Sequence, residues 1–214
     1  MCLQIIGYDH TRYDFATLVG RKLGCWDLSK LHELGTYPLF ERKNNQSTVY
    51  HKAFYSMGEE FLVVYRRFIR DVVREHVGEE VVYQRIPTFR VCLPGNVAVG
   101  EFHKDSDYMH GPTEQNYWVP LTKAFGNNAV WIESEPDKGD YRPAELGPGE
   151  ILHFDGVKLR HGNKINDTGS TRVSFDLRII PVSQYVENPR RTINTKMRFV
   201  VGDYFERTDQ EVPR

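Results

Sequence analysis

The sequence predicts one domain of mainly β structure, a double-sheet jelly roll of the double-stranded β-helix type, preceded by a helical region. After Gly78, short alternating or apolar runs are separated by turns that contain Gly and Pro, a pattern typical of packed antiparallel sheets rather than a parallel α/β fold. Before Gly78, apolar residues recur three or four positions apart, which is typical of helices. With 214 residues, the chain is long enough for one such domain, with helices within 1–78 and the jelly-roll core over 79–205.

Two short helices are expected first, over 14–23 and 27–34. Asp27 is suited to cap the second one, because its side chain can accept a hydrogen bond from a free backbone N–H of the first turn. Gly35 stands just past the end of that helix, where glycine is common. Both helices are expected to pack on the sandwich.

A long amphipathic helix is expected over about 50–77. Ser47 or Thr48 can cap its start, and Gly78 can end it. Gly58 can bend it, since glycine inside a helix costs about 1 kcal/mol relative to alanine. Its apolar stripe is interpreted as core packing against the sandwich rather than as a cofactor site. The stripe consists of Tyr50, Phe54, Met57, Phe61, Tyr65, Phe68 and Val72.

Seven strands are expected in the second part of the chain, where apolar residues alternate or form short runs. Three Gly-containing segments, 94–96, 126–128 and 147–149, are expected to be turns between them. The expected strands cover 81–93, 97–103, 115–121, 129–134, 150–154, 171–180 and 197–204.

The overall composition narrows the class of protein. The net charge of −1 gives no electrostatic reason to expect nucleic-acid binding. No segment approaches the roughly 20 consecutive apolar residues of a membrane span, and the N-terminus lacks the features of a signal peptide. The three cysteines are far apart and show no metal-site spacing, which fits a reducing cytoplasm. A cytoplasmic protein is therefore expected, and its oligomeric state stays open.

A metal site is predicted at His103 and Asp105. In an extended strand, residues two apart project to the same side, so both side chains can bind one ion. His161 is the expected third ligand, because Gly162 beside it would allow the backbone a close approach to the site. Two histidines and a carboxylate on one face of a metal form the facial triad of non-haem iron(II) oxygenases, which leaves the opposite face open.

The other histidines are weaker candidates for the third ligand than His161. His153 is the rival third ligand, although its apolar surroundings suggest a core histidine satisfied by a hydrogen bond. His110 can line the mouth of the pocket. The histidines of the leading region are expected to be surface or helix residues; these are His10, His32, His51 and His76.

A buried arginine is predicted behind the metal. The alternating run over 171–181 places Arg172, Ser174 and Asp176 on one face of a strand. A buried guanidinium group favours a carboxylate, because its planar fork pairs with two oxygens and it does not lose its charge. A dicarboxylic 2-oxo acid can supply it: one end chelates the metal and the far carboxylate reaches Arg172 and the Ser174 hydroxyl.

The order His-x-Asp, distal His, Arg-x-Ser resembles the iron(II)/2-oxoglutarate-dependent oxygenases. The similar blocks cover a little under half of the chain, between 88 and 181. They point to a small bacterial group of these oxygenases associated with aminoglycoside antibiotic pathways, such as those for streptomycin and hygromycin. The blocks are 89–96, 103–108, 116–122, 130–134, 154–156, 161–163 and 172–176.

The resemblance implies iron(II) held by His103, Asp105 and His161, 2-oxoglutarate anchored on Arg172 and Ser174, and molecular oxygen as co-reactant. Oxidation of the substrate, coupled to decarboxylation of 2-oxoglutarate to succinate, would give hydroxylation or oxidative ring closure. The carboxylate of Asp105 argues against the halogenase branch, in which a small residue leaves room for chloride.

Two further residues can bind the cosubstrate. Asn116 can contact the 2-oxo acid or the substrate, or face solvent. Arg90 can bind the chelating end of 2-oxoglutarate, or form a surface salt bridge.

An aminoglycoside-type sugar or aminocyclitol is the expected substrate, because carboxylates near the motifs suit an aminated molecule. Asp107, Glu133, Asp155 and Asp176 are the candidate carboxylates. The alternative is a turn for Asp107 and Asp155 and a salt bridge for Glu133. Tyr108 and Trp118 complete the predicted substrate-binding set.

Two other functions stay open. The same chemistry can act on an amino acid, a peptide or a nucleotide sugar. Alternatively, the chain is a metal-containing jelly roll that binds sugars without catalysis, in which case Arg172 pairs with an internal carboxylate such as Asp176 or Glu150.

Overall fold

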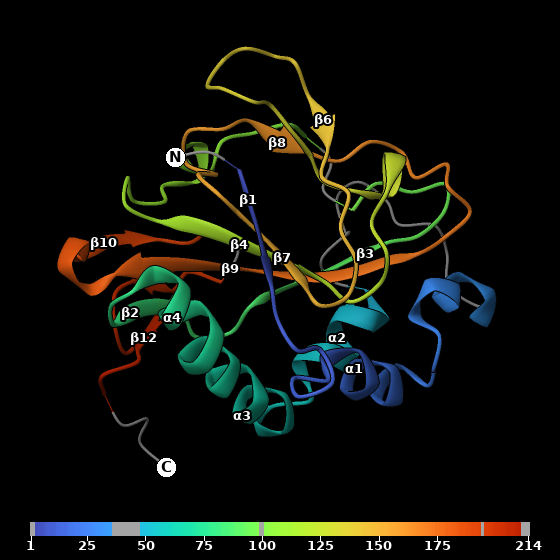
Figure 1. The fold of residues 1–214 in the computed structure, drawn as a ribbon, viewed down its shortest axis with the longest axis horizontal. Coiled ribbons are helices and arrows are strands. Elements are labelled where there is room, and N and C mark those ends of the chain that lie inside the picture. The colour runs from blue at the N-terminus through green and yellow to red at the C-terminus, as the bar shows by residue number, and fades with distance from the viewer. Residues whose placement is uncertain (1–2, 36–47, 99–100, 194, 211–214) are drawn as a thin grey trace.

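A computed structural model describes residues 3–35, 48–98, 101–193 and 195–210. It combines helices with antiparallel sheets in three layers (Figure 1). The helices cover one face of a large sheet, and a small sheet lies over the other face. None of the helices in the described ranges has both the length and the apolar character of a membrane-spanning segment.

The large sheet has seven antiparallel strands, in the order β1-β7-β4-β9-β2-β12, with β3 also paired to β9. The long central strand β9 bonds to β4, β2 and β3, so it is the axis of the sheet. The strands are β1 (Gln4–Gly7), β2 (Val81–Gln84), β3 (Thr88–Cys92), β4 (Gln115–Pro120), β7 (Glu150–Phe154), β9 (Arg172–Pro181) and β12 (Phe205–Arg207).

The other strands are short. β6 (Arg142–Pro143), β5 (Trp131–Ile132) and β8 (His161–Gly162) form the small sheet, and β10 (Asn188–Arg191) pairs with β11 (Arg198–Phe199). Within the described residues the strands thus form three unequal sheets. This arrangement differs from the two complete four-stranded sheets of an ideal jelly roll.

Several predicted strand boundaries are wrong. The run 81–93 is two strands, β2 and β3, because the chain turns between them. The described part of 97–103 holds only an isolated bridge at His103, and residues 99 and 100 lie outside the described ranges. The run 197–204 contains only the two-residue strand β11.

The N-terminal helices follow the capping signals. α1 (Phe15–Leu23) begins after Asp14, whose side chain accepts a bond from Thr17 N–H. Asp27 caps the next element as predicted and Gly35 ends it, but Leu28–Leu34 is a 3₁₀ helix.

The predicted long helix is broken. α2 (Val49–Tyr55) ends before Gly58, which has φ of 55° and ψ of −130°, so this glycine interrupts the helix rather than bending it. α3 (Glu59–Phe68) then continues through a π-helical turn (Ile69–Val73) into α4 (Arg74–Val77).

The capping predictions for this segment fare better. Thr48 caps α2, and Gly78 ends α4 with φ of 80°. Ser47, the other candidate cap, lies outside the described residues. The π turn adds a residue to the repeat, so Val73 is buried where the regular spacing predicts Val72.

The main apolar core lies between the helices and the large sheet. Phe175 on β9 packs edge-on against Phe15 of α1, Phe61 of α3 and Tyr65 of α3, with ring centroids 5.0, 5.7 and 6.2 Å away. The predicted aromatic stripe is therefore core packing. Because β9 alternates, this core turns Arg172, Ser174, Asp176 and Arg178 toward the opposite face, where the small sheet lies.

Candidate metal centre

His103 and His161 are brought together by their own backbones. The N–H of each donates to the carbonyl of the other at 2.9 Å. These two bonds form an isolated β-bridge between His103 and His161, the first residue of strand β8. Their imidazole rings lie with centroids 4.7 Å apart. Gly162 permits this close approach, because a Cβ there would lie 2.9 Å from Cγ and 3.0 Å from Cα of Phe102.

Asp105 completes the cluster from the first position of a 3₁₀ turn, Asp105–Tyr108. Its N–H donates to the Gly156 carbonyl at 2.8 Å, and its Oδ1 lies 3.6 Å from Nε2 of both His103 and His161. The prediction that His103 and Asp105 share a site is correct in outcome, but the argument from strand alternation is wrong, since the chain leaves the extended conformation at Asp105. One ligand atom from each residue lies within 4.8 Å of the others.

Both histidines present the tautomer that a metal needs. Nδ1 of His103 lies 2.8 Å from the Glu101 carbonyl, and Nδ1 of His161 lies 2.9 Å from the Leu159 carbonyl. A carbonyl oxygen only accepts, so each Nδ1 carries a proton, and in the neutral ring Nε2 then has the lone pair on the side of Asp105. Burial lowers the pKa of His161, although the charge of Asp105 opposes this shift. The lowered pKa favours the neutral form of the imidazole, which is the form that binds a metal. The donor set fits a divalent metal such as iron(II).

The Asp105 carboxylate is oriented from behind. Its Oδ2 accepts bonds from Asn116 Nδ2 and Arg178 Nη2, each at 2.8 Å, which leaves Oδ1 for the metal. Burial alone would raise the pKa of Asp105, but the charge of Arg178 holds it well below its usual range. Asn116 was predicted to contact the 2-oxo acid or the substrate, or to face solvent. Its amide nitrogen instead donates to Asp105, a predicted metal ligand.

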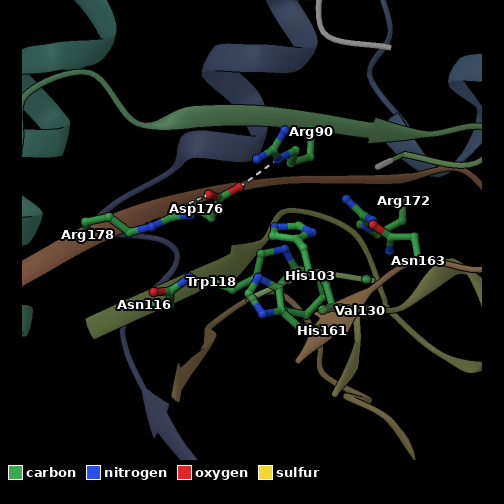
Figure 2. Close-up of a pocket in the computed structure, with 11 residues that line it drawn as sticks. Arg90, His103, Asn116, Trp118, Val130, His161, Asn163, Arg172, Asp176 and Arg178 are labelled. Atoms are coloured by element: carbon green, nitrogen blue, oxygen red, sulfur yellow. Dashed lines mark hydrogen bonds and ion pairs between the residues drawn. The ribbon is translucent and has the colours of Figure 1, made fainter. Parts of the chain in front are cut away.

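Arg172 lies deep in the same pocket (Figure 2) and is 1% exposed. Its Nε donates to the Asn128 carbonyl and its Nη1 to Ser174 Oγ, both at 2.9 Å, while its buried Nη2 has no hydrogen-bond partner. Trp118 Nε1 also donates to Ser174 Oγ, at 3.0 Å. Because that oxygen accepts twice, the Ser174 hydroxyl proton is available to a further group. Burial lowers the pKa of Arg172.

A second charged network runs along β9 and β3. Asp176 accepts from Arg90 Nε at 2.8 Å and from Arg178 Nη1 at 2.5 Å. Burial would raise the pKa of Asp176, but the two guanidinium groups lower it. Arg90, predicted to bind the cosubstrate or form a surface salt bridge, forms a salt bridge that is mostly buried, with 15% of its side chain exposed.

The pocket holds about 440 Å³, its open mouth included. His103, His161, Arg172 and Trp118 line it as predicted, and the Tyr108 ring lies edge-on to the His103 ring with centroids 4.9 Å apart. Three lining residues were not predicted for the site: Val130, Asn163 and Arg178. The alternation along β9 that identifies Arg172 and Ser174 also reaches Arg178, so that signal was available in the sequence.

Three predicted substrate-binding carboxylates do not line the pocket. Asp107 caps the 3₁₀ turn by accepting from Lys104 N–H at 3.0 Å. Glu133 is fully buried and accepts backbone bonds from Arg160 and Gly139. The carboxylate of Asp155 bonds the Lys158 backbone and ammonium groups. Asp107 and Asp155 have the turn roles that were their alternatives, whereas Glu133 bonds backbone N–H groups and forms no salt bridge among the described residues.

The rival histidines also have other roles. His153 lies on β7, where its Nε2 donates to Gln115 Oε1 at 2.6 Å and its ring stacks on Tyr117. Burial lowers its pKa to about 4, as expected for a neutral core histidine. His110 bonds Glu114 Oε2 at 2.6 Å and is not among the residues that line the pocket.

Comparison with known proteins finds a relative that is similar in sequence and several solved structures that are similar in fold. The streptomycin biosynthesis protein StrG of Streptomyces griseus is 42% identical over 199 residues, which cover 93% of this chain and 95% of that protein. No known family model matches the chain.

Among solved structures, the non-haem, α-ketoglutarate-dependent carbocyclase SnoK from nogalamycin biosynthesis aligns with a TM-score of 0.58 and 8% identity, over 96% of this chain and 91% of that one. EctD from S. alaskensis aligns with a TM-score of 0.52 and 16% identity, over 88% and 76%. The iron-bound form of EctD gives the same score and identity, over 86% and 74%. These likenesses concern the fold.

Proposed function

The chain belongs to the family of the streptomycin biosynthesis protein StrG, and on this basis we propose that it is an iron(II)- and 2-oxoglutarate-dependent oxygenase of antibiotic biosynthesis. Its fold is that of non-haem iron oxygenases, and it carries a His/Asp/His metal site. The large and small sheets would be the two walls of a distorted double-stranded β-helix, with the metal between them.

The unpartnered Nη2 of Arg172 is the observation that carries this proposal. Within the described residues Arg172 forms no ion pair, although a buried guanidinium group without a counter-charge is costly. The alternative of a non-catalytic module requires Arg172 to pair with Asp176 or Glu150. Asp176 instead pairs with two other arginines, and Glu150 accepts from Gly147 N–H.

A dicarboxylic 2-oxo acid matches this arrangement. Its far carboxylate would accept from Arg172 Nη2 and from the free proton of Ser174, and Trp118 would hold the serine oxygen in place. Its 2-oxo carboxylate end would lie toward His103 and His161, which line the same pocket.

The protein's own residues bind and orient. Asn116 and Arg178 fix which oxygen of Asp105 faces the metal, and the carbonyls of Glu101 and Leu159 fix the histidine tautomers. Iron(II), when bound, would supply the open coordination face at which oxygen is activated. Asp105 occupies the position that halogenases leave to chloride, which favours hydroxylation or oxidative ring closure.

An aminoglycoside-type sugar or aminocyclitol is the proposed class of substrate, since the relative StrG belongs to streptomycin biosynthesis. Succinate release in the presence of candidate substrates tests it. Stimulation by amino acids, peptides or nucleotide sugars, with none by aminosugars or aminocyclitols, would reject this class and keep the chemistry.

Anaerobic addition of iron(II) and 2-oxoglutarate tests the cofactor assignment. The chelate is expected to give a weak visible charge-transfer band, which a binding module without cosubstrate chemistry lacks. Arg172→Leu is expected to weaken 2-oxoglutarate binding by at least about tenfold, as loss of a charged hydrogen bond requires, and to spare the metal. His103→Ala is expected to remove both.

Arg21→Gln is the matched control for Arg172→Leu, because Arg21 is exposed on α1, on the far face of the large sheet. An Arg172→Leu protein that binds 2-oxoglutarate as tightly as this control contradicts the assignment of the anchor.

A further inference from the structure

Arg90 presents a second unpartnered cationic donor to the pocket. Its Nε is bonded to Asp176, but its Nη1 is buried and has no hydrogen-bond partner. The side chain lines the pocket and is 15% exposed, whereas Arg172 is 1% exposed as a whole residue. A guanidinium group in this position favours an oxyanion.

The Arg90 side chain is held in place. Asp176, which accepts from its Nε, also accepts from Arg178 Nη1 at 2.5 Å, and Arg178 in turn donates to Asp105. Turning Arg90 away would break the bond to Asp176 and leave part of a buried carboxylate unpaired. The guanidinium group of Arg90 is therefore held in place in the pocket lining.

Arg90 lies to one side of the path proposed for the cosubstrate. On β4, Asn116 bonds Asp105 and Trp118 bonds Ser174. Strands β4 and β9 therefore form the wall of the pocket between the metal ligands and Arg172. Arg90 comes from β3, on the opposite side of β9, where it pairs in register with Ser174. Figure 2 shows Arg90 on the other side of β9 from Asn116 and Trp118.

The pocket also keeps an excess of positive charge. Three arginines line it, Arg90, Arg172 and Arg178, against the carboxylates of Asp105 and Asp176. A divalent metal and a dianionic cosubstrate cancel each other, so this excess remains after both have bound. An ammonium group next to Arg90 would be repelled.

We propose that Arg90 binds an acidic group, a phosphate ester or a carboxylate, on the substrate of this enzyme. This inference rests on the proposed oxygenase function and specifies its substrate further. Nη1 of Arg90 would donate to the acidic group beside the metal, and any amino groups of the substrate would lie outside the pocket. Arg90 is then a specificity residue for the substrate and does not bind 2-oxoglutarate.

Four hexoses that differ in one substituent test the proposal: glucose 6-phosphate, glucuronate, glucose and glucosamine. Binding is measured by calorimetry on the full-length protein loaded with nickel(II) and 2-oxoglutarate, which does not turn over. Glucose 6-phosphate, glucuronate or both are expected to bind about tenfold tighter than glucose, the scale of one charged hydrogen bond. Which acidic probe binds tighter distinguishes phosphate from carboxylate.

Variants assign the preference to Arg90. Arg90→Gln is expected to abolish it, Arg90→Lys to retain part of it, and the exposed control Arg21→Gln to retain all of it. Asp176 keeps Arg178 as a partner in Arg90→Gln, and a thermal melt verifies that each variant is folded.

Three results of the calorimetry would overturn the proposal: no preference for acidic probes in the unmodified protein, tightest binding of glucosamine, or a preference that survives in Arg90→Gln. Weaker 2-oxoglutarate binding by Arg90→Gln, read from the anaerobic charge-transfer band, would also overturn it by assigning Arg90 to the cosubstrate. Absence of that band in the unmodified protein would instead reject the oxygenase function itself.

Discussion

Gly156→Ala is expected to weaken metal binding although Gly156 is not a ligand. A Cβ at this position would lie 2.5 Å from Nδ2, 2.6 Å from Cγ and 2.8 Å from Oδ1 of Asn116. Cβ atoms in proteins almost never lie that close to a non-bonded atom. The Asn116 amide would have to move by roughly 1 Å to regain ordinary contact distances. Its 2.8 Å bond to Asp105 would then be lost.

The size of the effect follows from that bond. A hydrogen bond to a charged group contributes about 1.5–3 kcal/mol. Loss of a group that orients a metal ligand typically costs about 10- to 100-fold in metal affinity. Arg178 still donates to Asp105 in the variant, so we expect the lower end, about tenfold.

Competition with a chelator measures the metal affinity of four proteins: unmodified, Gly156→Ala, Asn116→Ala and the double variant. Asn116→Ala is expected to lose about as much affinity as Gly156→Ala, and the double variant no more than either, because the added methyl group then has nothing to displace. Additive losses would refute this reasoning and assign the effect to the backbone at Gly156. An unchanged affinity in Gly156→Ala would refute it as well.

Two further perturbations address stability. Phe175→Ala is expected to lower the free energy of unfolding by roughly 3–5 kcal/mol, measured in urea, because it removes a fully buried ring between β9 and the helices; a loss below about 1 kcal/mol would contradict the described core. Burial lowers the pKa of His153 from 6.5 to about 4, so the unfolded chain takes up its proton first as the pH falls. Its contribution to stability is complete above pH 6.5 and is lost as the pH falls toward 4, and His153→Gln is expected to flatten this part of the stability profile; an unchanged profile would show that His153 is not buried as a neutral group.

The sequence predicts the metal site well because each ligand stands in a short motif. His103, Asp105 and His161 do converge, and so do Arg172 and Ser174, since alternation along one long strand sets their common face. Alternation does not explain Asp105, which is the start of a 3₁₀ turn held by the Gly156 carbonyl. That contact joins distant parts of the chain, and no local pattern encodes it.

The substrate residues were harder to predict for a related reason. Asp107, Glu133 and Asp155 stand next to motif residues in the sequence, but their carboxylates bond nearby backbone N–H groups instead of entering the pocket. Arg178 stands further from the motifs and enters it. Proximity in sequence was a poor guide here, whereas the face of the strand was a good one.

The helices show the same limit. Capping residues such as Asp14, Thr48 and Gly78 mark the ends as predicted, because caps act locally. The break at Gly58 and the π turn at Ile69–Val73 interrupt the regular repeat of the aromatic stripe, and the spacing of the apolar residues alone does not predict them.

The central claim is that iron(II) is bound by His103, Asp105 and His161 while 2-oxoglutarate reaches Arg172. Crystals soaked without oxygen in iron(II) and 2-oxoglutarate, with data collected at the iron absorption edge, test it most directly. We expect one strong anomalous peak in bonding contact with both histidine Nε2 atoms and Asp105 Oδ1, and a carboxylate on Nη2 of Arg172. A peak elsewhere, or 2-oxoglutarate bound away from Arg172, would contradict it.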